Sequence, residues 1–350
     1  MRLKTRPRVA AAALYLLLSA VACREVSNQD VRVVVPRGAN LGSAAKLLEE
    51  RHVIAHPTLF RLYGMIKGRD RSIRAGTYIL KGSMTWGEVL DVLNGGKSVE
   101  ASITIPEGWS LSQIVPQLAR VLHAPLDSVQ AAVHDTALLH ELDIPTATLE
   151  GYLFPDTYVF PDGTTPRVAV RLMVDRFRQV WQPAWDTTLQ KRALTRNDVM
   201  ALAAIVEKEA RLPEERPVIA AVYMNRVRAG MALQADPTVQ YAIGHHVTRV
   251  LYSDLKIDSP YNTYLYKGLP PGPIASPGKP SILAALNPAD VPYRFFVAHP
   301  DGHHQFSTNF AQHSAAVKQA RREWDSVAVV RRDTGRMAPA NLLPANNSSR

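Results

Sequence analysis

Hydrophobic positions in the first third of the chain alternate between the period of a β-strand and the period of an α-helix. Short runs of β-branched residues predict strands, and apolar residues recurring every three or four positions predict helices. The order strand, Pro-x-Gly turn, helix occurs twice, first from Val31 and again from Ala101. The predicted strands are 31–35, 76–80 and 101–105, and the predicted helices are 41–50, 85–93 and 111–121.

The pattern changes after residue 143, where turn-forming and aromatic residues are dense. Aromatic residues alternate with polar ones from Tyr152 to Phe160, as in a strand that faces a sugar, a partner or a packed core. Residues 268–280 contain five prolines, which exclude a helix or an interior strand and predict a rigid loop. Gln234, Asp236 and Thr238 alternate around Pro237, which predicts polar side chains presented on one side. Further helices are predicted at 167–181, 199–210, 218–229, 281–286 and 309–324, and strands at 293–298 and 303–307.

The predicted helix at 199–210 carries two carboxylates in its last turn, Glu207 and Glu209. Asn197 and Asp198 ahead of it are suitable N-caps, and the spacing of its apolar residues predicts one buried face. The two glutamates lie about 200° apart on such a helix, so one should face a groove or the core and the other should face water. A glutamate at the wet end of an apolar helix can act as a general acid. From this stretch alone, surface pairing of both glutamates with neighbouring basic residues is the favoured interpretation.

The net charge of the 350-residue chain is +10, and part of this charge belongs to a targeting signal. Four basic residues between positions 2 and 8 precede an apolar run from Val9 to Cys23. As a helix this run would span about 22 Å, which is less than the ~30 Å hydrocarbon core of a bilayer. The pattern predicts an export signal, either of the lipoprotein kind with Cys23 lipidated or an uncleaved membrane anchor. The bulk of the chain is therefore expected outside the cytoplasm.

The sequence gives no support to several other chemistries. It contains no Gly-x-Ser-x-Gly motif, no phosphate-binding loop and no dinucleotide fingerprint, and no cofactor or metal is expected. Cys23 is the only cysteine, so no internal disulfide can form. His299, His303 and His304 have no carboxylate at ligand spacing and are predicted to be polar hairpin tips. The basic residues are spread out rather than gathered in a stripe, so nucleic-acid binding is not expected.

Seven phrases between residues 149 and 309 resemble the endolytic murein transglycosylase family, also called YceG-like. They occur in the order found in the family, and the resemblance extends over roughly residues 31–325. The phrases are Leu149-Glu-Gly-Tyr-Leu-Phe-Pro-Asp-Thr-Tyr158, Ala204-Ile-Val-Glu-Lys-Glu209, Val222-Tyr-Met-Asn-Arg226, Leu233-Gln-Ala-Asp-Pro-Thr-Val239, Tyr261-Asn-Thr-Tyr264, Gly268-Leu-Pro-Pro-Gly-Pro-Ile-Ala-Ser-Pro277 and Phe306-Ser-Thr-Asn309.

The resemblance implies an α+β protein with a small LysM-like amino-terminal part and a lysozyme-like mixed α/β catalytic domain. The repeated strand–helix units themselves resemble LysM-like modules, which bind amino-sugar polymers, but their spacing also fits a generic α+β domain. The expected parts are an export signal or anchor at 1–23, a LysM-like module at 31–100, a second α+β segment at 101–165, the catalytic domain at 166–325 and a disordered tail at 326–350.

The family resemblance also implies an activity and a location. The enzyme would cleave new peptidoglycan strands internally, between N-acetylmuramic acid and N-acetylglucosamine, leave 1,6-anhydromuramoyl ends and terminate elongation. It would be held at the inner membrane with its catalytic domain on the periplasmic side, with glycan strands, the membrane and peptidoglycan synthases as candidate partners. A non-catalytic glycan-binding scaffold and a hydrolytic muramidase remain alternatives.

On the family pattern the first glutamate of Ile-Val-Glu-Lys-Glu, Glu207, is the catalytic acid and Glu209 is the secondary candidate. Glu207 is expected to lie against apolar walls with a raised pKa, and to take the proton of the muramic C6 hydroxyl after giving up its own. This internal nucleophile removes the need for a second carboxylate. The predicted saccharide contacts are Glu150, Asn225, Gln234, Asp236, Tyr261, Asn262 and Tyr264. For each of these residues a turn or capping role fits the sequence equally well.

Overall fold

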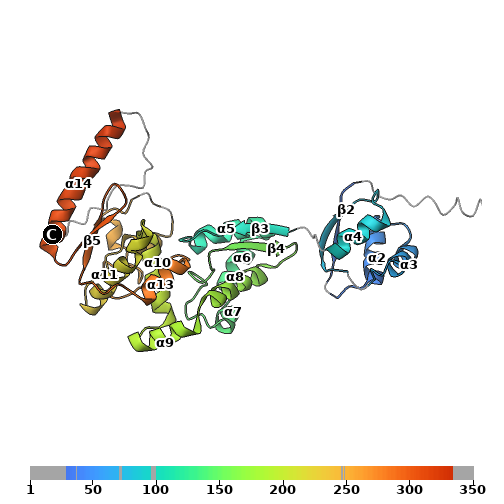
Figure 1. The fold of residues 1–350 in the computed structure, drawn as a ribbon, viewed down its shortest axis with the longest axis horizontal. Helices are drawn as coiled ribbons and strands as arrows, with labels where there is room; N and C mark the ends of the chain where they lie inside the picture. Colours follow the sequence, from blue (N-terminus) through green and yellow to red (C-terminus); the bar gives the residue numbers. More distant parts are fainter. Residues whose placement is uncertain are drawn as a thin grey trace, which may run out of the picture. The chain divides into compact units, whose positions relative to one another are not determined.

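The fold consists of two units that differ in their balance of strand and helix (Figure 1). A computed structural model describes residues 29–36, 38–70, 73–95, 100–245, 247 and 249–333. Unit 1 contains residues 29–101 and 159–164, and unit 2 contains residues 102–158 and 165–333. The predicted export signal with Cys23, and residues 334–350 of the predicted tail, lie outside the described residues.

Unit 1 packs three helices against a two-stranded antiparallel sheet. The strands β1 (Val31–Val35) and β2 (Gly76–Leu80) pair in a register that sets Val31 opposite Leu80. Between them lie α2 (Leu41–Glu50) and α3 (Pro57–Ile66), and α4 (Trp86–Gly95) follows. The sequence predicted both strands and α2 with these bounds, but it did not reveal α3.

Local side-chain contacts fix the helix ends of unit 1. The Asn40 side chain accepts a hydrogen bond from the Ser43 amide at the start of α2. At the start of α4 the Glu88 carboxylate accepts a hydrogen bond from the Thr85 amide, and the Glu88 amide donates to the Thr85 hydroxyl. Apolar side chains of all five elements then close one core, including Val33, Leu48, Phe60, Tyr78 and Leu90.

Unit 2 is mainly helical and contains a short sheet of β5 (Phe295–Ala298) and β6 (His304–Ser307). Strands β3 (Glu100–Thr104) and β4 (Thr157–Pro161) form a second pair, of which residues 102–104 and 157–158 belong to unit 2 and the others to unit 1. Residues 101–165 were predicted to form a segment apart from the catalytic domain, but nearly all of them belong to unit 2 because α5 and α6 pack on α8. The helices are α5 (Leu111–Leu122), α6 (Leu126–Val133), α7 (Thr136–Glu141), α8 (Pro166–Val180), α9 (Pro183–Arg192), α10 (Arg196–Glu209), α11 (Arg216–Arg228), α12 (Asp236–Ile243), α13 (Lys279–Leu286) and α14 (Phe310–Asp333), with 3₁₀ turns η1 (Pro213–Glu215) and η2 (Asp254–Lys256).

The central helix of unit 2 is α10, and its surroundings correct two predictions. The sequence predicted one buried face, yet every residue from Val199 to Val206 is buried, because α11, α12 and α13 pack around it (Figure 1). The N-cap is Thr195, whose side chain forms a capping box with Asp198, rather than Asn197. The Asn197 side chain instead donates a hydrogen bond of 2.7 Å to the carbonyl of Pro271 in the proline-rich loop.

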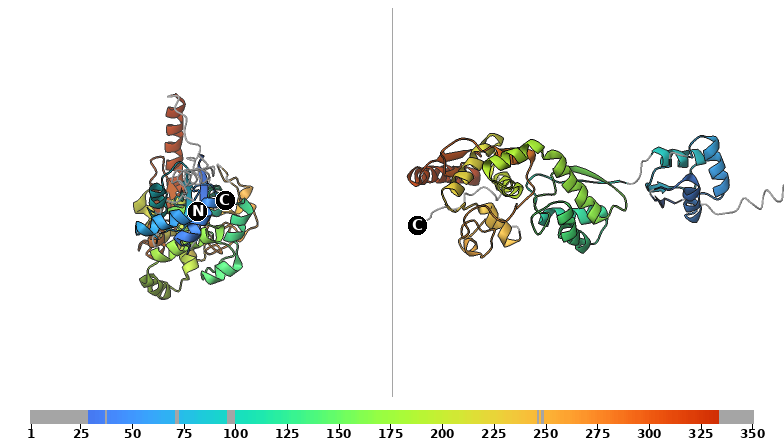
Figure 2. Two further views of the ribbon diagram at one scale, coloured as in Figure 1. Left: turned by 90° about the vertical axis from the view of Figure 1, so that its right-hand side faces the viewer. Right: turned by 90° about the horizontal axis from the view of Figure 1, so that it is seen from below.

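Two further predictions fail in the last third of the chain. Gln234, Asp236 and Thr238 were expected to present their polar side chains on one side, but Thr238 is buried in α12, where Pro237 occupies the first turn and a missing amide costs nothing. Helix α14 extends to Asp333, so residues 326–333 are helical and not part of a disordered tail. Figure 2 shows α14 projecting beyond the β5–β6 hairpin against which it packs. No helix among the described residues is long and apolar enough to cross a membrane.

Candidate active site

Glu207 lies at the end of α10 between two loops from distant parts of the sequence. Its side chain is only 7% exposed. One carboxylate oxygen accepts a hydrogen bond of 3.0 Å from the Gly278 amide, and the other lies 3.7 Å from the guanidinium of Arg216. The backbone of the Gly108 turn pairs with Ser276, since the Gly108 amide donates to the Ser276 carbonyl at 2.8 Å. Glu207 is therefore enclosed by the Pro106–Ser110 turn, the loop before α13, and Arg216.

A second carboxylate, Glu107, faces the same place and was missed in the sequence. Burial and the charge of Glu207 raise the pKa of Glu107, and Arg216 opposes them. Gly278 leaves room for this carboxylate, because a Cβ on Gly278 would lie 1.9 Å from its Oε1. The repeated Pro-x-Gly turn placed Glu107 at the start of a helix, but only the fold brings it to α10.

Glu209 faces a different part of unit 2. It lines a cavity of about 210 Å³, and its carboxylate accepts a hydrogen bond of 2.8 Å from the Tyr223 hydroxyl. Burial raises the pKa of Glu209 to about 7, and the Asp236 charge adds to this effect. The cavity is lined by Lys208, Glu209, Arg211, Tyr223, Arg226, Gln234, Asp236, Phe296, Val297, Ala298, His304, His313, Val317, Ala320 and Arg321.

The predicted arrangement of the two glutamates was therefore wrong in one respect. They do diverge around the helix, but neither carboxylate is a solvated surface charge. The residue between them, Lys208, is the exposed one, and its ammonium donates to the Gly108 carbonyl at 3.3 Å. The end of α10 thus offers one carboxylate to each of two separate enclosed places.

Two of the predicted saccharide contacts, Gln234 and Asp236, line the cavity of Glu209. Asp236 accepts a hydrogen bond of 2.5 Å from the Tyr264 hydroxyl, and burial raises its pKa. Tyr264 therefore acts on the cavity through Asp236. The cavity also contains His313, whose Nδ1 is buried without a hydrogen-bond partner and whose pKa is lowered by burial and by Arg226. No motif singled out His313.

The other predicted saccharide contacts do not line this cavity, and their side chains contact neighbouring loops and helices. Glu150 is 4% exposed and accepts a hydrogen bond of 3.1 Å from the Leu111 amide at the start of α5. Burial raises its pKa to about 7, and a hydrogen bond from Tyr241 opposes the shift. The ring of Tyr261 packs against Tyr241, with 4.7 Å between ring centroids.

The amide side chains of Asn225 and Asn262 support loops. Asn225 donates to the carbonyls of Val291 and Tyr293 at 2.8 and 2.9 Å. Asn262 is fully buried and donates to two carbonyls, at 3.0 and 2.8 Å, of the η2 segment and the residue after it. These residues hold the frame around the site and do not line the cavity itself.

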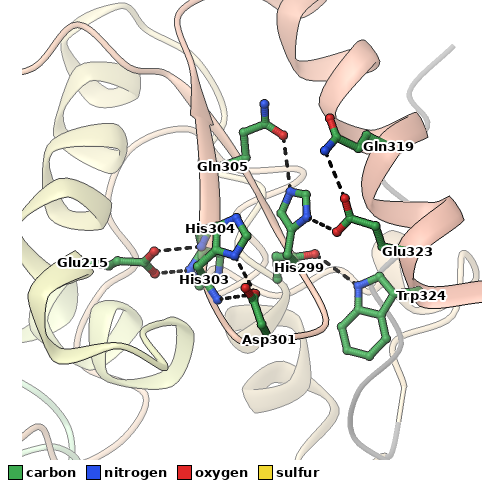
Figure 3. A network of polar contacts seen from close by, with 10 residues as sticks. Glu215, His299, Asp301, His303, His304, Gln305, Gln319, Glu323 and Trp324 are labelled. Atoms are coloured by element: carbon green, nitrogen blue, oxygen red, sulfur yellow. Dashed lines mark hydrogen bonds and ion pairs between the residues drawn. The ribbon is translucent and has the colours of Figure 1, made fainter. Parts of the chain in front are cut away.

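The histidines of the β5–β6 hairpin are paired with carboxylates (Figure 3). The Nδ1–H of His304 donates to the Glu215 carboxylate at 2.5 Å, and the Nδ1–H of His299 donates to the Glu323 carboxylate of α14 at 2.6 Å. His299 and His304 are buried, so the prediction of polar hairpin tips fits His303 alone. Within the described chain, no cluster of three or more His, Cys, Asp or Glu side chains could hold a metal ion.

Glu209 thus lines a polar cavity at the end of a helix packed by three other helices, and burial raises its pKa, a combination typical of enzymes that use a general acid. Sequence comparison identifies the family: residues 33–319 match the YceG-like family, and the chain belongs to that family. A Bacillus subtilis protein named endolytic murein transglycosylase is 34% identical over 308 residues, covering 84% of this chain and 85% of its own.

Two further relatives support the same family. A Streptococcus pneumoniae protein of the same name is 30% identical and covers 87% of this chain, which spans 61% of its length. The crystal structure of a putative YceG-like protein from Listeria monocytogenes matches with a TM-score of 0.58 and 30% identity, over 83% of this chain and all of that one.

Proposed function

We propose that the protein is an endolytic peptidoglycan lytic transglycosylase. It cleaves the bond between N-acetylmuramic acid and N-acetylglucosamine inside nascent strands and leaves 1,6-anhydromuramoyl ends, which terminates elongation. The family membership and the names of the relatives support the substrate. The observation that carries the chemistry is Glu209, whose pKa is raised to about 7 by burial in a cavity shared with Gln234 and Asp236.

In the proposed reaction Glu209 begins as a neutral acid. The Tyr223 hydroxyl donates to Oε1 of Glu209, which leaves Oε2 to carry the proton. That proton passes to the glycosidic oxygen as the bond to muramic C1 breaks, and the C6 hydroxyl oxygen of the same sugar attacks C1. The carboxylate then accepts the proton of that hydroxyl. No water is consumed and no cofactor is required.

The family resemblance implies Glu207 as the acid and Glu209 as the secondary candidate; we propose Glu209 because its carboxylate lines the cavity. Glu207 accepts a hydrogen bond from the Gly278 amide and lies beside Arg216. Both contacts hold the Glu207 carboxylate outside the cavity that Glu209 shares with Gln234 and Asp236. Glu207 is then a positioning residue that joins α10 to the loop before α13.

The test is mass spectrometry of isolated, uncrosslinked glycan strands incubated with the full chain, Glu209→Gln and Glu207→Gln. Anhydromuramoyl ends from the wild type and from Glu207→Gln, but none from Glu209→Gln, are expected. Loss of product only in Glu207→Gln would return the acid to that residue. Reducing ends would establish a hydrolytic muramidase, and binding without cleavage a scaffold.

We propose in addition that unit 1 is a LysM-like glycan-binding module and that the chain is held in the inner membrane by its amino terminus. The order β1, α2, α3, β2, with an antiparallel pair of strands, supports the first point. The basic residues and apolar run ending at Cys23 support the second. The intact mass of the amino-terminal peptide distinguishes an acylated Cys23 from an uncleaved anchor, and pull-down with peptidoglycan synthases tests the proposed partners.

A further inference from the structure

Helix α3 of unit 1 has an apolar face that nothing in the described structure covers. Four large apolar side chains on it are strongly exposed: Leu59 by 52%, Leu62 by 48%, Met65 by 43% and Ile66 by 75%. At about 100° per residue these four fall within an arc of about 120°. An apolar arc of this kind normally faces a core, and its exposure marks an interaction surface.

The opposite side of α3 already makes the contacts that the fold requires. Phe60 is fully buried in the core of unit 1. Gly64 lies so close to α2 that a Cβ on it would be 2.4 Å from Leu41 Cδ2. Because the core side of α3 is satisfied, the exposed face is not a consequence of poor packing.

The charges around α3 favour an anionic surface. Between residues 51 and 74 the chain contains six Lys and Arg residues and a single acidic residue, Asp70. Arg61 and Lys67, which flank the apolar face, are both exposed. A short helix with an apolar face and basic flanks is typical of segments that lie in the headgroup layer of a membrane.

The inference rests on the proposed amino-terminal anchor, which would bring unit 1 close to the bilayer. Seven residues separate Cys23, the end of the predicted signal or anchor, from Val31 in β1, and they reach at most about 30 Å when extended. A unit of this length has a radius of gyration of about 11 Å, so any of its faces can touch the membrane from that tether. A second copy of the chain is a poorer occupant, because four side chains of one helix fall well short of the ~800 Å² per partner of a stable interface.

We infer that the exposed face of α3 docks on an anionic phospholipid bilayer, with Leu59, Leu62, Met65 and Ile66 in the acyl–headgroup boundary and Arg61 and Lys67 at the phosphates. The amino terminus then provides one attachment of unit 1 and α3 a second, which fixes the orientation of this unit on the membrane. The inference does not depend on the reaction proposed for unit 2.

The test uses the full chain reconstituted in vesicles of phosphatidylethanolamine and phosphatidylglycerol. A photo-crosslinking residue, p-benzoylphenylalanine, replaces Leu62 or Ile66, and mass spectrometry detects phospholipid adducts after illumination. The matched control places it at Ile79, which is apolar and 46% exposed in the same unit but lies on β2. All three positions are exposed, so the fold is retained, and thermal unfolding verifies this.

Abundant lipid adducts at 62 and 66, with few at 79, are expected. Arg61→Glu with Lys67→Glu should lower the adduct yield on the order of tenfold, as should vesicles of neutral phosphatidylcholine alone. Equal yields at all three positions, or no adducts at 62 and 66, would overturn the inference. Crosslinked dimers at these positions would assign the face to a second copy of the chain.

Discussion

Replacing Glu209 by glutamine should stabilise the protein at neutral and alkaline pH while abolishing its activity. The carboxyl group of Glu209 is enclosed, and burial raises its pKa from 4.5 to about 7. Between these values the folded state keeps a proton that the unfolded state has lost. The contribution of this group to the free energy of unfolding is therefore fully present below pH 4.5 and is lost as the pH rises through 7.

The size of the effect follows from the shift. A difference of about 2.5 pKa units corresponds to about 3 kcal/mol. Glutamine does not titrate, and its carbonyl can still accept the hydrogen bond from Tyr223. Near pH 8 the Glu209→Gln variant should thus exceed the wild type in free energy of unfolding by up to about 3 kcal/mol, and the difference should vanish near pH 4.

Urea unfolding followed by tryptophan fluorescence measures this difference, because four of the five tryptophans lie in unit 2. Release of anhydromuramoyl ends measures activity, which in the wild type should fall above about pH 7 as the acid loses its proton. Glu150→Gln is the matched control: Glu150 is buried with a pKa of about 7 but supports α5 outside the cavity. It should show a similar gain in stability and remain active.

Cleavage of strands by Glu209→Gln at the wild-type rate would refute the assignment of Glu209 as the acid. Equal loss of activity in Glu209→Gln and Glu150→Gln would also refute it, since the effect would then come from disturbing any buried carboxylate. A pH profile of stability that is the same for wild type and Glu209→Gln would show that the carboxylate is not enclosed as the structure has it.

Two further predictions concern the frame of unit 2. Gly151→Ala should lower the free energy of unfolding by about 3 kcal/mol, because φ is +78° and the new Cβ would lie 2.2 Å from a proline ring. The matched control is Gly244→Ala, where φ is the same but nothing lies within 4 Å of the new Cβ. This control should lower the free energy of unfolding by about 1 kcal/mol. Equal shifts in melting temperature would contradict the steric argument. Glu215→Ala should lower the free energy of unfolding by about 2–3 kcal/mol, because it leaves buried His304 without its partner. Asp301→Ala removes an exposed pair and should change the free energy of unfolding by less than about 0.5 kcal/mol. Thermal unfolding measures both variants.

Sequence patterns predicted helices and strands correctly where neighbouring residues alone carry the structural signal. The β-branched runs gave β1 and β2 with their observed bounds, because alternation and flanking turn residues are local signals. Helices α6, α7 and α9 were missed, and α9 shows why: only Trp185 and Leu189 of its ten residues are buried, so it carries little apolar periodicity. In α12, which the sequence pattern did not reveal, Pro237 occupies the first turn, where a helix tolerates a proline.

The motif phrases contain several residues of the cavity but do not indicate how these residues are arranged. The motif phrases contain Glu207, Glu209, Gln234 and Asp236, yet no spacing indicates that the last three share a cavity that excludes the first. Glu107 comes from a hundred residues upstream and reaches Glu207 only because the backbone at Gly108 pairs with the loop at Ser276. Such contacts depend on tertiary packing, which the local periodicity of a sequence does not reveal.

The end of α10 separates two carboxylates of the same phrase into opposite electrostatic roles. Beside Glu207 the guanidinium of Arg216 faces the carboxylate directly, at 3.7 Å. Beside Glu209 the comparable cation is Arg226, but its guanidinium donates to the carbonyls of Arg294 and Leu233, both at 2.6 Å. An arginine committed to backbone carbonyls leaves burial as the dominant influence on its acidic neighbour. The fold therefore surrounds two glutamates, two residues apart, with different partners, and burial raises the pKa of Glu209, which suits it to give up a proton during cleavage of a glycosidic bond.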